Sequence, residues 1–108
     1  MKLPSNAVIA PAKITHYLLH LLEQDDKSQF LALAGYSVAN ADRLLQDIRE
    51  QLLPLEAELI GPVEYGTKYL IRGTLRGPNG SELRVVSIWI TLETTGLTKF
   101  VTLYPDKL

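Results

Sequence analysis

Two segments near the end of the chain carry the side chains best suited to bind a ligand. Lys68 and Arg72 supply positive charge in the first segment, and Trp89 supplies a large amphipathic ring in the second. If both segments are strands joined by a turn at 77–80, Lys68 faces Trp89, because side chains alternate along each strand. An aromatic and basic sheet face of this kind can stack a base, hold a cation or anchor a protein partner.

The same register predicts the side chains of both sheet faces. The predicted core face holds Tyr69, Ile71, Val86, Ile88, Ile90 and Leu92. The predicted second face holds Lys68, Arg72, Arg76, Ser87, Trp89 and Thr91, and a fourth strand with Val101 and Leu103 inward adds Phe100, Thr102 and Tyr104. Two interpretations stay open: this face is a site, or it is covered by the N-terminal segment, a short helix or a second subunit.

The other groups of polar or glycine residues in the sequence do not indicate a metal site, a phosphate-binding loop or a catalytic set. His16, His20 and Glu23 have helical spacing, but they face solvent and nothing marks a further ligand, so we expect no metal and no cofactor. The segment 77–80 has two glycines without the strand-to-helix context of a phosphate loop, and we interpret it as a turn. Without cysteine or a nucleophile elbow, no catalytic set can be named.

Apolar periodicity predicts helices in the first half of the chain. Pro11 begins one helix, and Gly35 ends a second, short one. A third helix begins near Ser37 or Asn40 and ends before Pro54. The apolar stripes are Ile14, Tyr17, Leu18, Leu21 and Leu22, then Phe30, Leu31, Leu33 and Ala34, then Ala41, Leu44, Leu45, Ile48 and Leu52. The predicted solvent-exposed face of the third helix includes Arg43 and Asp47.

From Leu55 onward the apolar period changes to that of strands. We expect a strand from Leu55, a hairpin of 68–76 with 81–92, and a last strand ending near Tyr104-Pro105. The predicted fold class is α+β, with two or three N-terminal helices packed on one face of a four-stranded antiparallel meander sheet. We expect one domain over 1–108, with a helical half at about 10–53 and a sheet half at about 55–105.

Composition narrows the classes of function. The 108 residues are 46% hydrophobic and have a formal charge of −1, which is typical of a globular protein and unlike a duplex-DNA binder. No long apolar run predicts a membrane span, and the first residues do not have the pattern of a signal peptide. We therefore expect a cytoplasmic protein that binds neither duplex DNA nor membrane.

Several segments together resemble a bacterial family of small α+β domains with no established activity. The segments are Tyr17-Leu18-Leu19, Lys27 to Tyr36, Tyr65-Gly66-Thr67-Lys68-Tyr69, Gly77-Pro78-Asn79-Gly80, Ile88-Trp89-Ile90 and Val101-Thr102-Leu103-Tyr104-Pro105. Members also look like domains at the C-terminal ends of phage-related or toxin-like proteins. The resemblance implies binding roles for six motif positions, namely Lys27, Tyr65, Lys68, Trp89, Thr102 and Tyr104.

Two hypotheses of function follow. The first is a non-enzymatic interaction domain that uses the aromatic and basic sheet face to hold a protein partner or a second copy of the chain. The alternative is a metal-independent, toxin-like ribonuclease or an RNA-binding domain that uses the same face, with Lys68 and Arg72 on phosphate and Trp89 or Tyr104 on a base.

Overall fold

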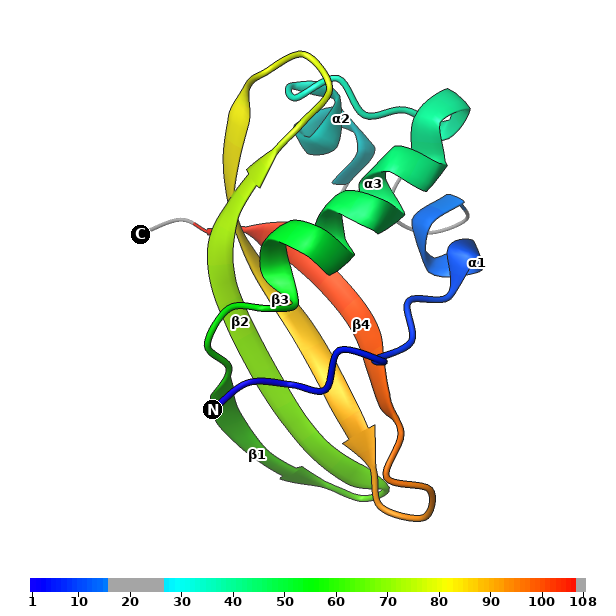
Figure 1. Ribbon diagram of the computed structural model, residues 1–108, viewed down its shortest axis with the longest axis vertical. Helices are drawn as coiled ribbons and strands as arrows, with labels where there is room; N and C mark the ends of the chain where they lie inside the picture. Colours follow the sequence, from blue (N-terminus) through cyan, green and yellow to red (C-terminus); the bar gives the residue numbers. More distant parts are fainter. Residues whose placement is uncertain (16–26, 107–108) are drawn as a thin grey trace.

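Short helices are followed by an antiparallel sheet in the computed structural model, which describes residues 1–15 and 27–106 (Figure 1). The helical elements are α1 (Pro11–Lys13), α2 (Lys27–Ala32), the 3₁₀ turn η2 (Val38–Asn40), α3 (Ala41–Asp47) and the π-helical η3 (Ile48–Leu52). The strands are β1 (Glu58–Val63), β2 (Gly66–Arg76), β3 (Glu82–Leu92) and β4 (Thr98–Pro105). The four strands form a meander in the order β1-β2-β3-β4, which confirms the predicted fold class.

The helices begin and end where local sequence signals indicate. Pro11 opens α1, and Gly35 has a φ of 92° just after α2, a left-handed conformation that glycine adopts without strain. At the start of the third helical segment, the Asn40 Oδ1 accepts a 2.7 Å hydrogen bond from the Ser37 backbone N–H. The rest of the first predicted helix, with His16, His20 and Glu23, lies outside the described residues.

One face of the sheet packs against the helices, and we call it the inner face. Figure 1 shows α3 crossing the sheet. The helical part of the chain gives the shared core Ile14, Leu31, Leu44, Ile48 and Leu52, and the sheet gives it Ile71, Leu75, Val85, Trp89, Phe100 and Leu103. Burial of these side chains on both layers is the main term that holds the helices to the sheet.

The N-terminal segment crosses from one edge of the sheet to the other, as the dark blue trace in Figure 1 shows. It begins at the bridge between Lys2 and Glu56 and ends beside β4, where Val8 pairs with Lys99. The Arg49 guanidinium holds the crossing in place, because it donates to the Ser5 carbonyl at 3.1 Å and to the Ala7 carbonyl at 2.9 Å. This crossing sets the position from which α1 begins.

The pairing of β2 with β3 differs by one residue from the predicted register. Arg76 pairs with Glu82, and Lys68 pairs with Ile90 rather than with Trp89. A slip of one residue moves every side chain of a strand to the other face. The predicted faces are therefore wrong for β3: Ser87, Trp89 and Thr91 lie on the inner face, and Val86, Ile88, Ile90 and Leu92 lie on the opposite one.

The slip arises at the turn, where contacts with the helical layer decide the geometry. The Gly77 N–H donates to the Ser81 carbonyl at 3.0 Å, so pairing continues one step beyond Arg76. The Ala34 carbonyl, just after α2, receives a 3.2 Å hydrogen bond from the Asn79 N–H. A Cβ on Gly77 would lie 2.1 Å from the same oxygen. These contacts join residues far apart in sequence, so local turn signals do not contain them.

An irregularity in β4 changes which of its side chains face the core. Ile88 pairs with Thr102 but Trp89 pairs with Phe100, which leaves Val101 as the extra residue. Phe100 therefore joins Leu103 on the inner face, where its ring meets Trp89 edge-on with centroids 5.2 Å apart. The inward direction of Leu103 was predicted correctly, and the outward direction of Phe100 was wrong.

Candidate functional site

Trp89 is a core residue and has no part in the protein surface. Its side chain is 0% exposed, and its Nε1–H donates to the Ser87 Oγ at 2.9 Å. The Ser87 hydroxyl in turn donates to the Ile71 carbonyl at 3.1 Å. A ring enclosed and hydrogen-bonded in this way cannot meet a partner while the domain stays folded, so the placement of Trp89 at a binding face is corrected.

The opposite side of the sheet, which we call the outer face, brings together four of the residues singled out from sequence. Lys68 and Arg72 lie on it in β2, and Thr102 and Tyr104 lie on it in β4. The pairing arranges this face in three rows across β2, β3 and β4. The rows are Lys68–Ile90–Lys99, Leu70–Ile88–Thr102 and Arg72–Val86–Tyr104.

Each row has an aliphatic centre and a polar or basic margin. Ile88 and Ile90 are 9% and 6% exposed, although they lie outside the core that joins the sheet to the helices. Arg72 and Lys99 at the margins are exposed, and Tyr104 is 38% exposed. The outer face therefore carries a line of aliphatic side chains along β3, almost fully buried, between flanking strands that carry positive charge and hydroxyl groups.

Ion pairs divide the basic side chains of the outer face into two groups. Arg72 lies 3.1 Å from the Asp106 carboxylate and 3.8 Å from that of Glu58. Lys68 and Lys99 form no ion pair with any residue in 1–15 or 27–106. Positive charge is therefore partly neutralised at the Arg72 end of the face and remains at the other end.

Lys27 and Tyr65, the two remaining predicted residues, lie at the margins of this face. The Lys27 Nζ donates to the Thr102 Oγ1 at 3.0 Å, which connects the start of α2 with β4. Tyr65 lies between β1 and β2 and is 60% exposed. Its carbonyl accepts a 3.0 Å hydrogen bond from the Glu93 N–H, which fixes the backbone that carries the ring.

A cleft of about 240 Å³ lies beside Tyr65, and we call it the lysine cleft. It is lined by Lys13, Tyr65, Lys68, Ile90, Leu92, Lys99, Phe100 and Val101. Among the described residues, none that lines this cleft is acidic. Sequence reasoning missed Lys13 and Lys99, because the first comes from the helical layer and the second follows from the register of β4.

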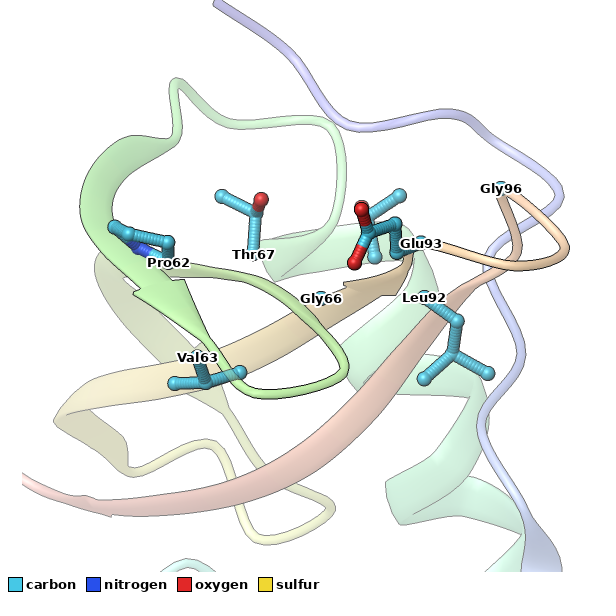
Figure 2. A pocket seen from close by; sticks show the side chains of 8 residues that line it. Pro62, Val63, Gly66, Thr67, Leu92, Glu93 and Gly96 are labelled. Carbon is cyan, nitrogen blue, oxygen red and sulfur yellow. The ribbon is translucent and has the colours of Figure 1, made fainter.

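A second cleft, of about 400 Å³, lies at the same end of the sheet and shares Leu92 with the lysine cleft. Figure 2 shows Pro62, Val63, Thr67 and Glu93 among its lining side chains. Of the described residues that line it, Glu93 alone is charged, and it is exposed. A single solvated carboxylate beside aliphatic and threonine side chains offers no proton-transfer pair.

A buried polar network was also missed, and it lies among the helices and the end of β2. The Tyr36 hydroxyl donates to the Asp47 carboxylate at 2.6 Å, and the Arg43 Nε lies 2.9 Å from the same carboxylate. Asp47 is 4% exposed, so its predicted place on a wet helix face is wrong. Burial, and then the hydrogen bond to Asp47, raises the pKa of Tyr36 far above its ordinary value. We assign the network to stability.

The described residues contain neither a cluster of metal-ligating side chains nor a membrane-spanning helix. Within 1–15 and 27–106, no three His, Cys, Asp or Glu side chains gather as metal ligands would. In the same ranges, none of the helices has the length and apolar character needed to cross a membrane.

Comparisons with known proteins agree with this fold. A family described as a domain of unknown function, DUF6883, matches residues 2–107. A solved chain from a contact-dependent growth inhibition toxin–immunity protein complex of Klebsiella pneumoniae 342 is similar with a TM-score of 0.60 at 17% sequence identity. The match covers 96% of this chain and 97% of that one, and at this identity it shows the fold alone. Comparison with curated proteins gave no match.

Proposed function

This chain belongs to the DUF6883 family, a domain of unknown function, and on that premise we propose that it is a binding domain whose outer face holds an acidic protein partner. The observation that carries the proposal is the arrangement of the three rows. An apolar centre with a polar and charged rim is the usual anatomy of a protein–protein interface. Tyrosine and arginine, which stand at the margin of the third row, are the residue types that most often dominate binding energy.

Charge indicates the kind of partner. The whole chain has a formal charge of −1, whereas the outer face carries Lys68, Arg72, Arg84 and Lys99. Two of its acidic residues, Glu58 and Asp106, pair with Arg72, and a third, Glu82, lies opposite Arg76 at the turn end of β3. Complementary potentials speed association and select partners, so a partner with an acidic patch fits this face better than a basic one.

The structural comparison supports a protein as the partner. The similar chain comes from a complex of a toxin with its immunity protein, and two proteins associate there. We propose by analogy that the present chain also works as one member of a protein pair. A second copy of the chain fits less well, because two equally basic faces would repel each other.

RNA is the alternative occupant, and the burial of Trp89 weakens the case for it. Trp89 was the strongest candidate for base stacking, and it is 0% exposed. Tyr65 and Tyr104 remain as exposed rings, at 60% and 38%. An RNA ligand would be recognised mainly through phosphate, with steep salt dependence, and its aromatic contacts would be few.

The test is affinity capture from an extract of the source cells with the wild-type chain, Arg72→Gln, Arg84→Gln and Lys2→Gln. Lys2 is exposed and lies at the far edge of the sheet, so Lys2→Gln removes the same charge away from the outer face. We expect a captured protein with an acidic excess, retained after nuclease treatment. Calorimetry on the purified pair should show about tenfold weaker binding for each outer-face variant.

Three results would contradict the proposal. Capture that disappears after ribonuclease treatment would assign the face to RNA. A wild-type mass twice that of the chain by light scattering, with no second protein bound, would assign it to self-association. A protein bound equally well by Arg72→Gln, Arg84→Gln and Lys2→Gln would place the interface elsewhere.

A further inference from the structure

The row Lys68–Ile90–Lys99 places two ammonium groups on either side of one aliphatic residue. Both lysines pair directly with Ile90, one from each neighbouring strand, and all three side chains leave the sheet on the outer face. With strands about 4.8 Å apart, the two lysine Cα atoms lie roughly 10 Å from each other. Flexible four-carbon stems let both ammonium groups converge on a ligand above Ile90.

Lys13 lines the same cleft from a distant part of the sequence, and it also has an interaction partner of its own. It ends α1, directly after the N-terminal segment that is fastened to β4. The fastening consists of two 2.8 Å hydrogen bonds, from the Val8 N–H to the Thr98 carbonyl and from the Phe100 N–H to the Val8 carbonyl. The sheet and the N-terminal layer thus set three ammonium-bearing residues around one volume.

Electrostatics favours an anion in this volume. Lys68 and Lys99 both line the cleft, and neither forms an ion pair with a residue in 1–15 or 27–106. Like charges that share a cleft repel one another, and an anion between them replaces that repulsion with attraction. A phosphate group suits lysines well, because its several oxygens can each accept a charge-assisted hydrogen bond.

The rest of the lining indicates what carries the phosphate. Ile90, Leu92 and Val101 form an aliphatic floor, and the ring of Tyr65 stands exposed at the margin. A bare inorganic ion would leave both features unused. An attached sugar can pack on the floor, and an attached base can stack on Tyr65, since every base presents a π-face.

We propose that the lysine cleft binds a nucleoside monophosphate, with its phosphate held by Lys68 and Lys99 and its base stacked on Tyr65. This small-ligand site goes beyond the proposed protein interface. It lies at one end of the outer face, while Arg72 and Arg84 lie toward the other end. The two sites can therefore succeed or fail separately.

The experiment is calorimetric titration of the full chain with adenosine monophosphate, adenosine and inorganic phosphate at about 0.1 M salt, where the Debye length is about 10 Å. The wild type should bind the nucleotide about tenfold more tightly than either fragment, because only the nucleotide uses both lysines and ring. Lys68→Gln and Lys99→Gln should each weaken nucleotide binding by about tenfold. Tyr65→Leu should bring nucleotide affinity close to that of phosphate, with only the sugar contact left, and should leave phosphate affinity unchanged.

Arg84→Gln is the matched control. It removes one positive charge from the same face about 20 Å along β3, at roughly 3.3 Å per residue, and should change nucleotide affinity less than twofold. Circular dichroism checks that every variant keeps its fold.

Each of the following results would overturn the proposal. Equal affinity for adenosine and the nucleotide would mean that the phosphate, and the lysines proposed to hold it, contribute nothing. Equal affinity for phosphate and nucleotide would make the cleft a simple anion site. If Arg84→Gln and Lys68→Gln weaken nucleotide binding equally, the nucleotide responds to the overall charge of the protein and not to the lysine cleft. Loss of nucleotide binding would leave the protein-partner test untouched, since that test depends on Arg72 and Arg84.

Discussion

At the scale of single residues, Ser87 joins two strands to the largest ring of the core. Its Oγ accepts a hydrogen bond from the Trp89 Nε1–H and donates one to the Ile71 carbonyl, with the side chain 0% exposed. Ser87→Ala leaves the buried indole N–H without its acceptor, which costs about 1–3 kcal/mol. We expect urea unfolding, followed by Trp89 fluorescence, to show a loss of that size.

Ser81→Ala is the control for this prediction, because Ser81 is exposed at the turn before β3. It should change the unfolding free energy by less than about 0.5 kcal/mol. Equal stability of Ser87→Ala and the wild type would mean that another acceptor replaces Ser87.

Tyr36 gives the domain a predictable response to alkali. Burial and the contact with Asp47 raise its pKa in the folded state, while the unfolded chain has the ordinary tyrosine pKa of about 10. The contribution of Tyr36 to the free energy of unfolding is fully present below about pH 10. It is lost as the pH rises further, because the tyrosine hydroxyl then releases its proton in the unfolded chain but not in the folded one. Urea unfolding at about pH 9 and 11 should show a smaller loss for Tyr36→Phe than for the wild type. The same loss in both would show that other groups cause the alkaline response.

At the scale of elements, the β2–β3 hairpin depends on the close approach of Gly77 to the helical layer. A Cβ at this position would lie 2.1 Å from the Ala34 carbonyl oxygen, which belongs to the backbone and cannot turn away. Gly80, three residues later, has a φ of 86° but no atom within 4 Å of a Cβ. Gly77→Ala must therefore push the turn away from α2, whereas Gly80→Ala only strains its own backbone.

The two glycine variants should differ clearly in stability. We expect a loss of about 1 kcal/mol for Gly80→Ala, from left-handed strain, and a larger loss for Gly77→Ala, at the upper end of the roughly 0.5–3 kcal/mol typical of single substitutions. Thermal unfolding followed by circular dichroism provides the comparison. If Gly80→Ala proves the more damaging variant, the contact with Ala34 does not fix this turn.

The β2–β3 hairpin separates the features of the fold that the sequence predicts from those that it does not. Apolar periodicity and Gly or Pro punctuation were enough for the order and the approximate bounds of the elements, because these signals are local. The register was not predictable, because contacts of Gly77 and Asn79 with residues after α2 decide it. One misplaced pairing moved Trp89 from the core to the surface in the prediction, while Lys68 and Arg72 kept their face because they belong to β2.

At the scale of the whole molecule, both halves of the chain contribute to one core. Ile48 of η3 and Ile71 of β2 are each 0% exposed and belong to the same apolar cluster. The radius of gyration is 13.4 Å, close to the roughly 13 Å expected of one folded domain of this length. We therefore propose that residues 1–108 unfold as a single cooperative unit.

Matched substitutions in the two halves test this cooperativity. Ile48→Val and Ile71→Val each remove one buried methylene at a cost of about 0.5–1.5 kcal/mol, which lowers the midpoint of a domain this size by roughly 2–12 °C. Ile60→Val in β1 is the control, because Ile60 is 52% exposed. Calorimetry should show one transition, moved by both core variants and nearly unmoved by the control. Two transitions, with Ile48→Val lowering the midpoint of one and Ile71→Val that of the other, would mean that the helical and sheet halves fold separately. The shape of the outer face would then depend on the sheet alone, without support from the helices.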